Sequence, residues 1–142
     1  MTPVDQQIID KDVGDCWKCC IASVMDLPYG EVPHFVKAQV WYGLDHFVSC
    51  WNWLGPRGLC IETISADIVF GRCKEEEIAE FARNLPPYLI ASGWSPRGDW
   101  YHAVVWDRLE QRIAHDPHPS RDGLRGGPIH FEAILPLQVD SH

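Results

Sequence analysis

The stretch GDCWKCCIASV, residues 14–24, places a cysteine at the start of what its pattern predicts to be a buried helix. Asp15 is a residue type favoured at N-caps, so Cys16 is expected in the first helical turn. Apolar residues then recur at intervals of three and four, as in a helix buried along one face: Trp17, Cys20, Ile21, Val24 and Leu27. Because a residue before proline resists helical angles, the helix is expected to run from about 15 to 26 and to stop before Pro28.

Cys16 has two interpretations at this position. The free N–H groups of a first helical turn stabilise a thiolate relative to a thiol, which makes a cysteine there a candidate nucleophile. Alternatively, Cys16 is only a small residue at a helix start. The choice depends on whether catalytic partners lie elsewhere in the chain.

Two strands far down the chain carry such partners. Residues 100–107 are predicted to form a strand with His102 near its beginning, and residues 111–116 the next strand, with Asp116 at its end. A turn around residues 108–110 would join them into a ribbon that sets His102 and Asp116 side by side. Together with Cys16 on a helix, this is the Cys–His–Asp order of a thiol hydrolase.

These motifs resemble those of the papain-like cysteine peptidases. The matching residues are Asp15-Cys16, Cys20, His102-Ala103-Val104-Val105 and Asp116-Pro117. The likeness is greatest to the peptidase domains that cleave double-glycine leaders from bacteriocins, and stretches 27–35 and 115–120 also resemble small stand-alone members from phages and bacteria. It spans roughly residues 5–137. The resemblance implies that Cys16 is the nucleophile, His102 the base and Asp116 the residue that orients the base.

The chain departs from that family at the oxyanion hole. The family usually has a glutamine about six residues before the cysteine, whereas position 10 here is Asp10, whose ionised side chain cannot donate a hydrogen bond. Gln6 and Gln7 are the available replacements if the longer connection folds back, and we favour Gln6. The second donor is expected to be the backbone N–H of Cys16 or Trp17.

The whole chain has the composition of one soluble globular domain, residues 1–142, with 46% hydrophobic and 23% charged residues. The net charge of −8 argues against nucleic-acid and anionic membrane partners. No apolar run has the length of a membrane span, and no signal peptide is recognisable at the start, so a cytoplasmic location is expected. The expected partner is a peptide or protein substrate; no cofactor is expected, and the oligomeric state stays open.

A zinc site is a weaker interpretation of the six cysteines. Cys16 and Cys19 form a C-x-x-C pair, but structural zinc usually needs a second closely spaced pair. His115 and His118 make a poor one, because the prolines beside them prevent a helix that would align them. We therefore expect reduced cysteines and no metal.

The remaining pattern predicts an α+β fold with N-terminal helices packed on a C-terminal antiparallel β-sheet. The resemblance implies that this fold is papain-like. Further helices are expected over 31–42, 44–54 and 74–85, the last a surface helix with Ile78, Phe81 and Ala82 facing inward. Extended segments are expected over 58–64, 88–92 and 129–137. The loop 93–99 should border the site, and Trp100 and His118 are expected to contact substrate.

Three classes of function follow from these observations. The leading hypothesis is a thiol hydrolase that cleaves a peptide or isopeptide bond through a thioester. An amidase or acyltransferase would use the same three residues. A catalytically silent papain-like binding protein is favoured by Asp10 in place of the glutamine, and a zinc-stabilised interaction module is the third class.

Overall fold

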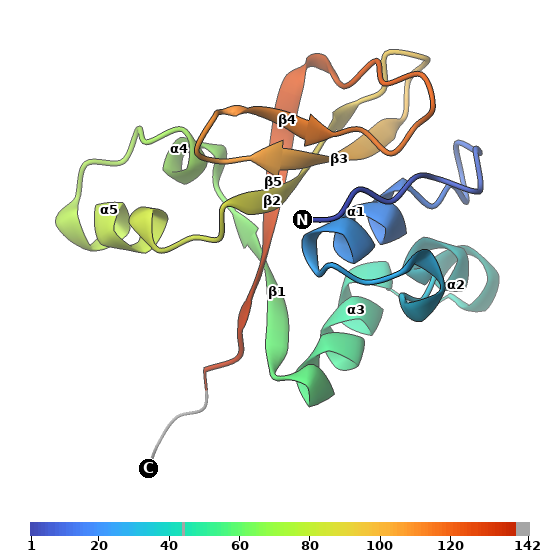
Figure 1. The fold of residues 1–142 in the computed structure, drawn as a ribbon, viewed down its shortest axis with the longest axis horizontal. Coiled ribbons are helices and arrows are strands. Elements are labelled where there is room, and N and C mark those ends of the chain that lie inside the picture. Colours follow the sequence, from blue (N-terminus) through green and yellow to red (C-terminus); the bar gives the residue numbers. More distant parts are fainter. Residues whose placement is uncertain (44, 139–142) are drawn as a thin grey trace.

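The computed structural model describes residues 1–43 and 45–138 and divides them into short helices and five strands (Figure 1). In chain order these are α1 (Cys16–Val24), a 3-10 turn (Tyr29–Glu31), α2 (Phe35–Tyr42), α3 (His46–Leu54), a 3-10 turn (Gly55–Arg57), β1 (Leu59–Ile64), α4 (Ala66–Val69), α5 (Glu76–Arg83), β2 (Tyr88–Trp94), β3 (Tyr101–Asp107), β4 (Arg112–His115) and β5 (Arg125–Pro136).

The strands form one sheet in the order β1-β5-β2-β3-β4, and all of the pairs between neighbouring strands are antiparallel. Figure 1 shows α1, α2 and α3 on one side of this sheet and α4 and α5 on the other. The α+β class is therefore confirmed. β1 precedes α5, as expected from the extended segment 58–64 and the helical segment 74–85, so the sheet is not confined to the C-terminal part of the chain.

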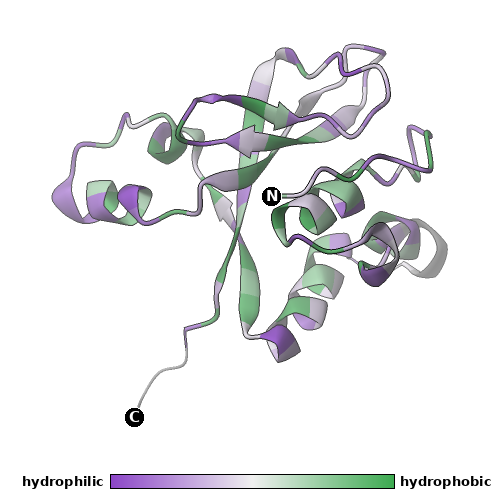
Figure 2. Ribbon diagram, viewed as in Figure 1, coloured by the Kyte–Doolittle hydropathy of each residue, from purple (hydrophilic) through white to green (hydrophobic). Residues whose placement is uncertain are grey.

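Two apolar cores lie on the two faces of the sheet, because successive side chains of a strand point to opposite sides. Val105 packs with the buried stripe of α1, whereas Val104 packs with Phe131 and the α4 side. Figure 2 shows apolar residues concentrated on α1 and along β1, whereas α5 carries both apolar and hydrophilic residues. Among the described residues no helix is long and apolar enough to cross a membrane.

The helix and strand boundaries differ from the sequence expectations mainly at prolines and glycines. The second helix begins only at Phe35, because Pro33 lies inside the expected range and a 3-10 turn comes before it. β5 begins at Arg125 rather than 129, since Gly126 and Gly127 adopt positive φ values of 75° and 83° and let the strand continue through an irregular stretch. The short helix α4 was not predicted.

The prediction that α5 buries an apolar face is wrong. None of its residues is buried, and Phe81 is 43% exposed. The helix also has only eight residues, Glu76–Arg83, rather than the predicted range 74–85. Its apolar side is only partly covered: α4 contacts the helix, and Ile78 and Ala82 are half-buried.

Candidate active site

Cys16 is the first residue of α1 and is only partly buried. Helix geometry leaves the N–H groups of this first turn without carbonyl partners four residues back. Cys19, Cys20 and Cys50 are buried, and burial raises the pKa of each thiol, that of Cys50 to about 12. Cys16 is therefore more accessible to solvent than these three cysteines.

His102 and Asp116 meet across the ribbon formed by β3 and β4. His102 lies near the start of β3, Asp116 directly follows β4, and each is only 4% exposed. The Nε2 atom of His102 lies 2.6 Å from Oδ1 of Asp116. The same carboxylate accepts backbone N–H groups from His118 at 2.9 Å and from Gly123 at 2.8 Å. Asp116 is therefore held by three donors and in turn fixes the imidazole ring.

The His102 side chain also forms a hydrogen bond with Cys16. Because Nε2 faces Asp116, Nδ1 is the ring nitrogen left for the sulfur. Burial lowers the pKa of His102, but the hydrogen bonds with Asp116 and Cys16 outweigh it and raise the pKa to about 9. Burial likewise works to raise the pKa of Asp116, but the bonds from His102 and the two backbone N–H groups hold it below its usual value. The geometry thus favours a charged imidazolium between sulfur and carboxylate.

The N-terminal segment is pinned against the loop that follows β4. The backbone N–H of Gln6 donates to the carbonyl of Pro117 at 2.9 Å. The ring of His115 contacts the carbonyl of Val4 at 3.1 Å, and Arg121 forms an ion pair with Asp5 at 2.7 Å. These contacts place Gln6 beside the Cys–His–Asp group.

A tight loop over residues 9–14 makes this placement possible. Its base is closed by a hydrogen bond from the N–H of Asp15 to the carbonyl of Ile8, at 3.3 Å. Inside the loop, Oδ1 of Asp10 accepts the N–H groups of Asp12 and Val13. Gly14 is required here, because a Cβ at this position would lie 2.3 Å from the carbonyl oxygen of Asp10. The longer connection therefore does fold back, and Gln6 lies near Cys16 despite nine intervening positions in sequence.

Asp15 is the N-cap residue of α1, as the sequence indicated, but its side chain makes no capping hydrogen bond. Its carboxylate is fully buried and accepts the backbone N–H groups of Gln7 and Ile8 and the hydroxyl of Tyr29. A buried carboxylate needs such donors to offset the loss of water. Asp15 therefore ties the Gln6 segment to the start of α1.

A cavity of about 350 Å³ opens beside the sulfur. It is lined by Gln6, Ile9, Asp10, Lys11, Cys16, Arg97, Trp100, His102 and His118. Gln6 reaches the cavity, and its Nε2 donates to the carbonyl of Ile8 at 3.2 Å, which leaves the second N–H of the amide for another acceptor. Its Oε1 is buried and has no hydrogen-bond partner among the described residues. Gln7 is exposed and does not line the cavity.

The other predicted site residues have different placements. Trp100 and His118 both line the cavity, as expected for residues that contact a ligand. The side chain of Trp17 does not: its indole Nε1 donates to Glu132 at 2.8 Å. The part of Trp17 that could serve as the predicted oxyanion donor is its backbone N–H in the first turn of α1, and the backbone N–H of Cys16 stays the alternative.

Arg97, Lys11 and Ile9 line the cavity but were not singled out from the sequence. Arg97 lies in the loop between β2 and β3, and its Nη1 donates to the Ser120 hydroxyl at 3.0 Å, so it joins two loops around the opening. Gly98 in the same loop leaves room for the Trp100 ring, since a Cβ there would lie 1.9 Å from a ring carbon. The position of this Gly- and Pro-containing loop upstream of His102 was the available signal.

No group of three or more His, Cys, Asp or Glu side chains within residues 1–43 and 45–138 is arranged to hold a metal ion. Cys19 is buried in α1, and the ring of His115 is engaged with Val4. The geometry thus gives no support to the zinc interpretation.

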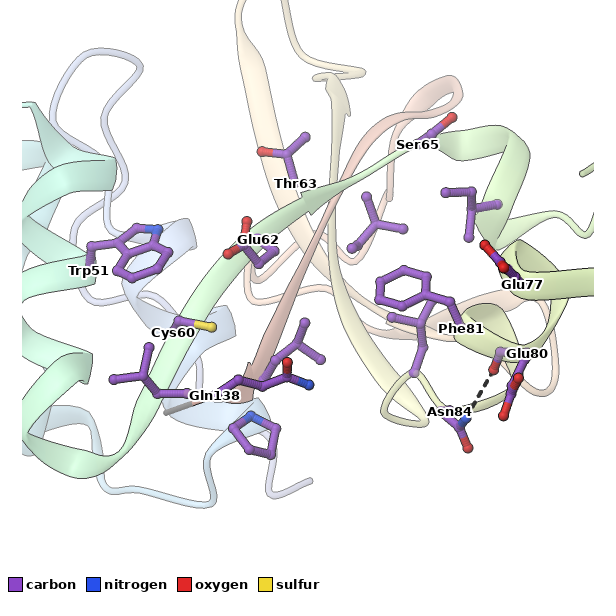
Figure 3. Close-up of a pocket in the computed structure, with 16 residues that line it drawn as sticks. Trp51, Cys60, Glu62, Thr63, Ser65, Glu77, Glu80, Phe81, Asn84 and Gln138 are labelled. Atoms are coloured by element: carbon purple, nitrogen blue, oxygen red, sulfur yellow. Dashed lines mark hydrogen bonds between the residues drawn. The ribbon is translucent and has the colours of Figure 1, made fainter. Parts of the chain in front are cut away.

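A second and larger cavity, about 910 Å³, lies between β1 and α5 and shares no lining residue with the first (Figure 3). Size alone would favour it as the binding site. The smaller cavity is the better candidate for chemistry, because it contains the cysteine and the histidine with a strongly raised pKa.

Comparison of the chain with protein-family models, with curated proteins and with solved structures finds no match. The functional assignment therefore rests on the residues of this chain and on how the fold arranges them.

Proposed function

We propose that the protein is a thiol hydrolase that cleaves a peptide or isopeptide bond, with Cys16 as nucleophile, His102 as acid and base, and Asp116 as orienting residue. The observation that carries the proposal is the position of one imidazole ring, which bonds to Asp116 through Nε2 and to Cys16 on its other side, at the wall of an open cavity. A papain-like arrangement, with the nucleophile at a helix start and the base on a facing strand, agrees with this geometry.

The first half-reaction forms a thioester. The Cys16 thiolate bonds to the carbonyl carbon, and the electron pair of the C=O bond moves to oxygen. The free N–H of the Gln6 amide and a first-turn backbone N–H of α1 receive that oxyanion. His102 then gives its proton to the leaving nitrogen as the C–N bond breaks.

The second half-reaction restores the enzyme. Neutral His102 takes a proton from water, and the resulting hydroxide bonds to the thioester carbon. Collapse of this intermediate breaks the C–S bond, releases a carboxylic acid and regenerates the thiolate beside the imidazolium. Asp116 stays ionised throughout and stabilises the charged ring, as its lowered pKa allows.

We also infer that the reaction takes place in a reducing compartment. A thiolate nucleophile must remain reduced, and all six cysteines of the structure are free. Amidase and acyltransferase reactions use the same chemistry up to the thioester and differ in the leaving group or in the final acceptor. The size of the leaving group released from a peptide library distinguishes these reactions.

Selective alkylation tests the proposal. At pH 6 an ordinary thiol is only about 0.3% ionised, whereas the imidazolium beside Cys16 persists up to about pH 9. Limiting iodoacetamide at pH 6, followed by peptide mapping, is expected to label Cys16 first. Cys73 is the other partly exposed cysteine and serves as the internal reference. The preference should disappear in His102→Ala, whereas Cys73→Ser should leave the labelling rate of Cys16 unchanged.

Peptide cleavage provides a second test of the proposal. Mass spectrometry of a mixed peptide library should show cleavage by the wild type and none by Cys16→Ala, with a transient acyl-enzyme on Cys16. Equal labelling of Cys16 and Cys73, or labelling that is indifferent to His102, would contradict the proposed nucleophile. Selective labelling without any acyl-enzyme would instead favour a silent binding protein.

A further inference from the structure

We propose that the cavity between α5 and β1 is a docking groove for a basic, partly apolar peptide segment of another protein. Figure 3 shows Phe81 of α5 on one side of the groove, Trp51 of α3 on the other and β1 between them. The volume of about 910 Å³ is large enough to receive several side chains. The groove does not share a residue with the cavity of the candidate active site, so its role does not depend on the hydrolase proposal.

The first argument is apolar surface that the chain itself leaves open. α5 has its apolar residues on one side, yet none of its residues is buried. Phe81 is 43% exposed and Leu137, directly after β5, is 38% exposed, and both line the groove. Leu135 of β5 contributes to the same lining. Contiguous apolar surface of this kind marks interaction sites on soluble proteins.

The second argument is charge. Glu62, Glu77 and Glu80 line the groove and are exposed, and the described lining residues include no lysine, arginine or histidine. None of these three carboxylates forms an ion pair among the described residues. Lysine and arginine fit such a groove, because their methylene stems pack on apolar surface while their heads reach carboxylates at the rim.

The same charges disfavour a second copy of this chain as the occupant. A symmetric contact through the groove would bring the three glutamates of each copy together, in a protein whose net charge is already −8. Like charges placed opposite each other across an interface are costly. An anionic ligand is disfavoured for the same reason. Polar side chains at the rim, among them Asn84 and Gln138, are available to bind a peptide backbone.

The test uses synthetic fluorescent heptapeptides with the full-length protein. The probe alternates lysine with leucine; one control peptide has glutamate in place of lysine, and a second has serine in place of leucine. Fluorescence anisotropy is expected to show that the protein binds the probe and neither control peptide. This binding should weaken when the ionic strength rises from about 0.05 to about 0.5 M. Phe81→Ser should weaken binding at least about fivefold, as expected when an aromatic anchor is removed from an interface.

Charge variants locate the contact. Glu77→Gln and Glu80→Gln should each weaken binding roughly two- to fivefold. Glu110→Gln removes an exposed carboxylate on the β3–β4 turn and should leave binding unchanged. Because Phe81, Glu77 and Glu80 are exposed, these variants should fold, which circular dichroism verifies.

Several outcomes would overturn the proposal. Failure of the probe to bind, equal binding of the acidic peptide, or binding indifferent to Phe81 would each do so. Light scattering tests whether a second copy of this chain occupies the groove. A dimer that the substitution Phe81→Ser dissociates would show that the groove is a contact between copies.

Discussion

Replacement of Asp116 by alanine removes the carboxylate that holds the imidazole of His102. Three hydrogen bonds are lost, to Nε2 of His102 and to the backbone N–H groups of His118 and Gly123. Both members of the ion pair are only 4% exposed. Removal of one partner from a buried charged pair costs about 3–5 kcal/mol. We expect Asp116→Ala to lower the free energy of unfolding by that amount near pH 6.

The loss should depend on pH in a defined direction. The pKa of His102 is raised to about 9, so stabilisation by its charged form is complete below the ordinary value of about 6.5 and is lost as pH rises through about 9. The difference between these two pKa values corresponds to about 3 kcal/mol of folding stability. The lowered pKa of Asp116 reports the same pair from its acid side, where stabilisation disappears as pH falls through that value. The two shifts share the His102–Asp116 interaction, so their energies are not added, and Cys16 also contributes to the shift of His102.

Urea unfolding of the wild type and of Asp116→Ala at several pH values measures this effect. Their difference should be about 3–5 kcal/mol at pH 6 and should shrink to about 1 kcal/mol at pH 10. Ionisation of the buried cysteines on unfolding is common to both proteins and cancels. Asp116→Asn is the matched variant: its oxygen can still accept from His102, but its NH₂ group opposes a backbone donor, so its loss should be smaller. A difference that stays constant from pH 6 to 10, or a His102 that titrates near 6.5 by NMR, would refute the charged pair.

Three further outcomes are expected. Gln6→Ala should lower turnover about 100-fold or more with the fold intact, whereas Gln7→Ala, outside the cavity, should not; equal rates would place the oxyanion donor elsewhere. Asp15→Ala leaves buried donors unpaired and should lower the free energy of unfolding by about 2–4 kcal/mol, measured by thermal denaturation. An unchanged melting temperature would contradict the role of Asp15 in holding the N-terminal segment against α1. Burial raises the pKa of Glu132, although the hydrogen bond from the Trp17 indole opposes this shift. Glu132→Gln should therefore stabilise the protein relative to the wild type at pH 8, where Glu132 is ionised, and much less at pH 4. Denaturant titration at the two pH values checks the sign of the difference.

Sequence patterns were sufficient to predict the helix that begins at Cys16 and the ribbon that carries His102 and Asp116. Both rest on short-range rules: a stripe of apolar residues at helical spacing, and two alternating segments separated by a short turn. The observed elements, Cys16–Val24, Tyr101–Asp107 and Arg112–His115, lie within two residues of the expected bounds. Local periodicity is sufficient there because each element is specified by its own residues.

The groups that complete the site could be identified only from the three-dimensional structure. Gln6 lines the cavity because the loop 9–14 closes between Ile8 and Asp15 and because the chain before it is fastened to Pro117. Asp15 is suited to a cap by residue type, yet its carboxylate binds the preceding segment instead. These contacts join residues that are far apart in the chain or separated by an irregular loop, and such contacts leave no periodic trace in sequence.

The exposure of the apolar face of α5 also could not be predicted from sequence. Its spacing of apolar residues correctly indicated a helix with one apolar side, and that spacing normally means burial. Whether such a side is covered depends on where the rest of the chain runs, and here it borders an open groove rather than the core. Sequence periodicity specifies that a helix has an apolar face, whereas only the three-dimensional path of the chain specifies what, if anything, packs against it.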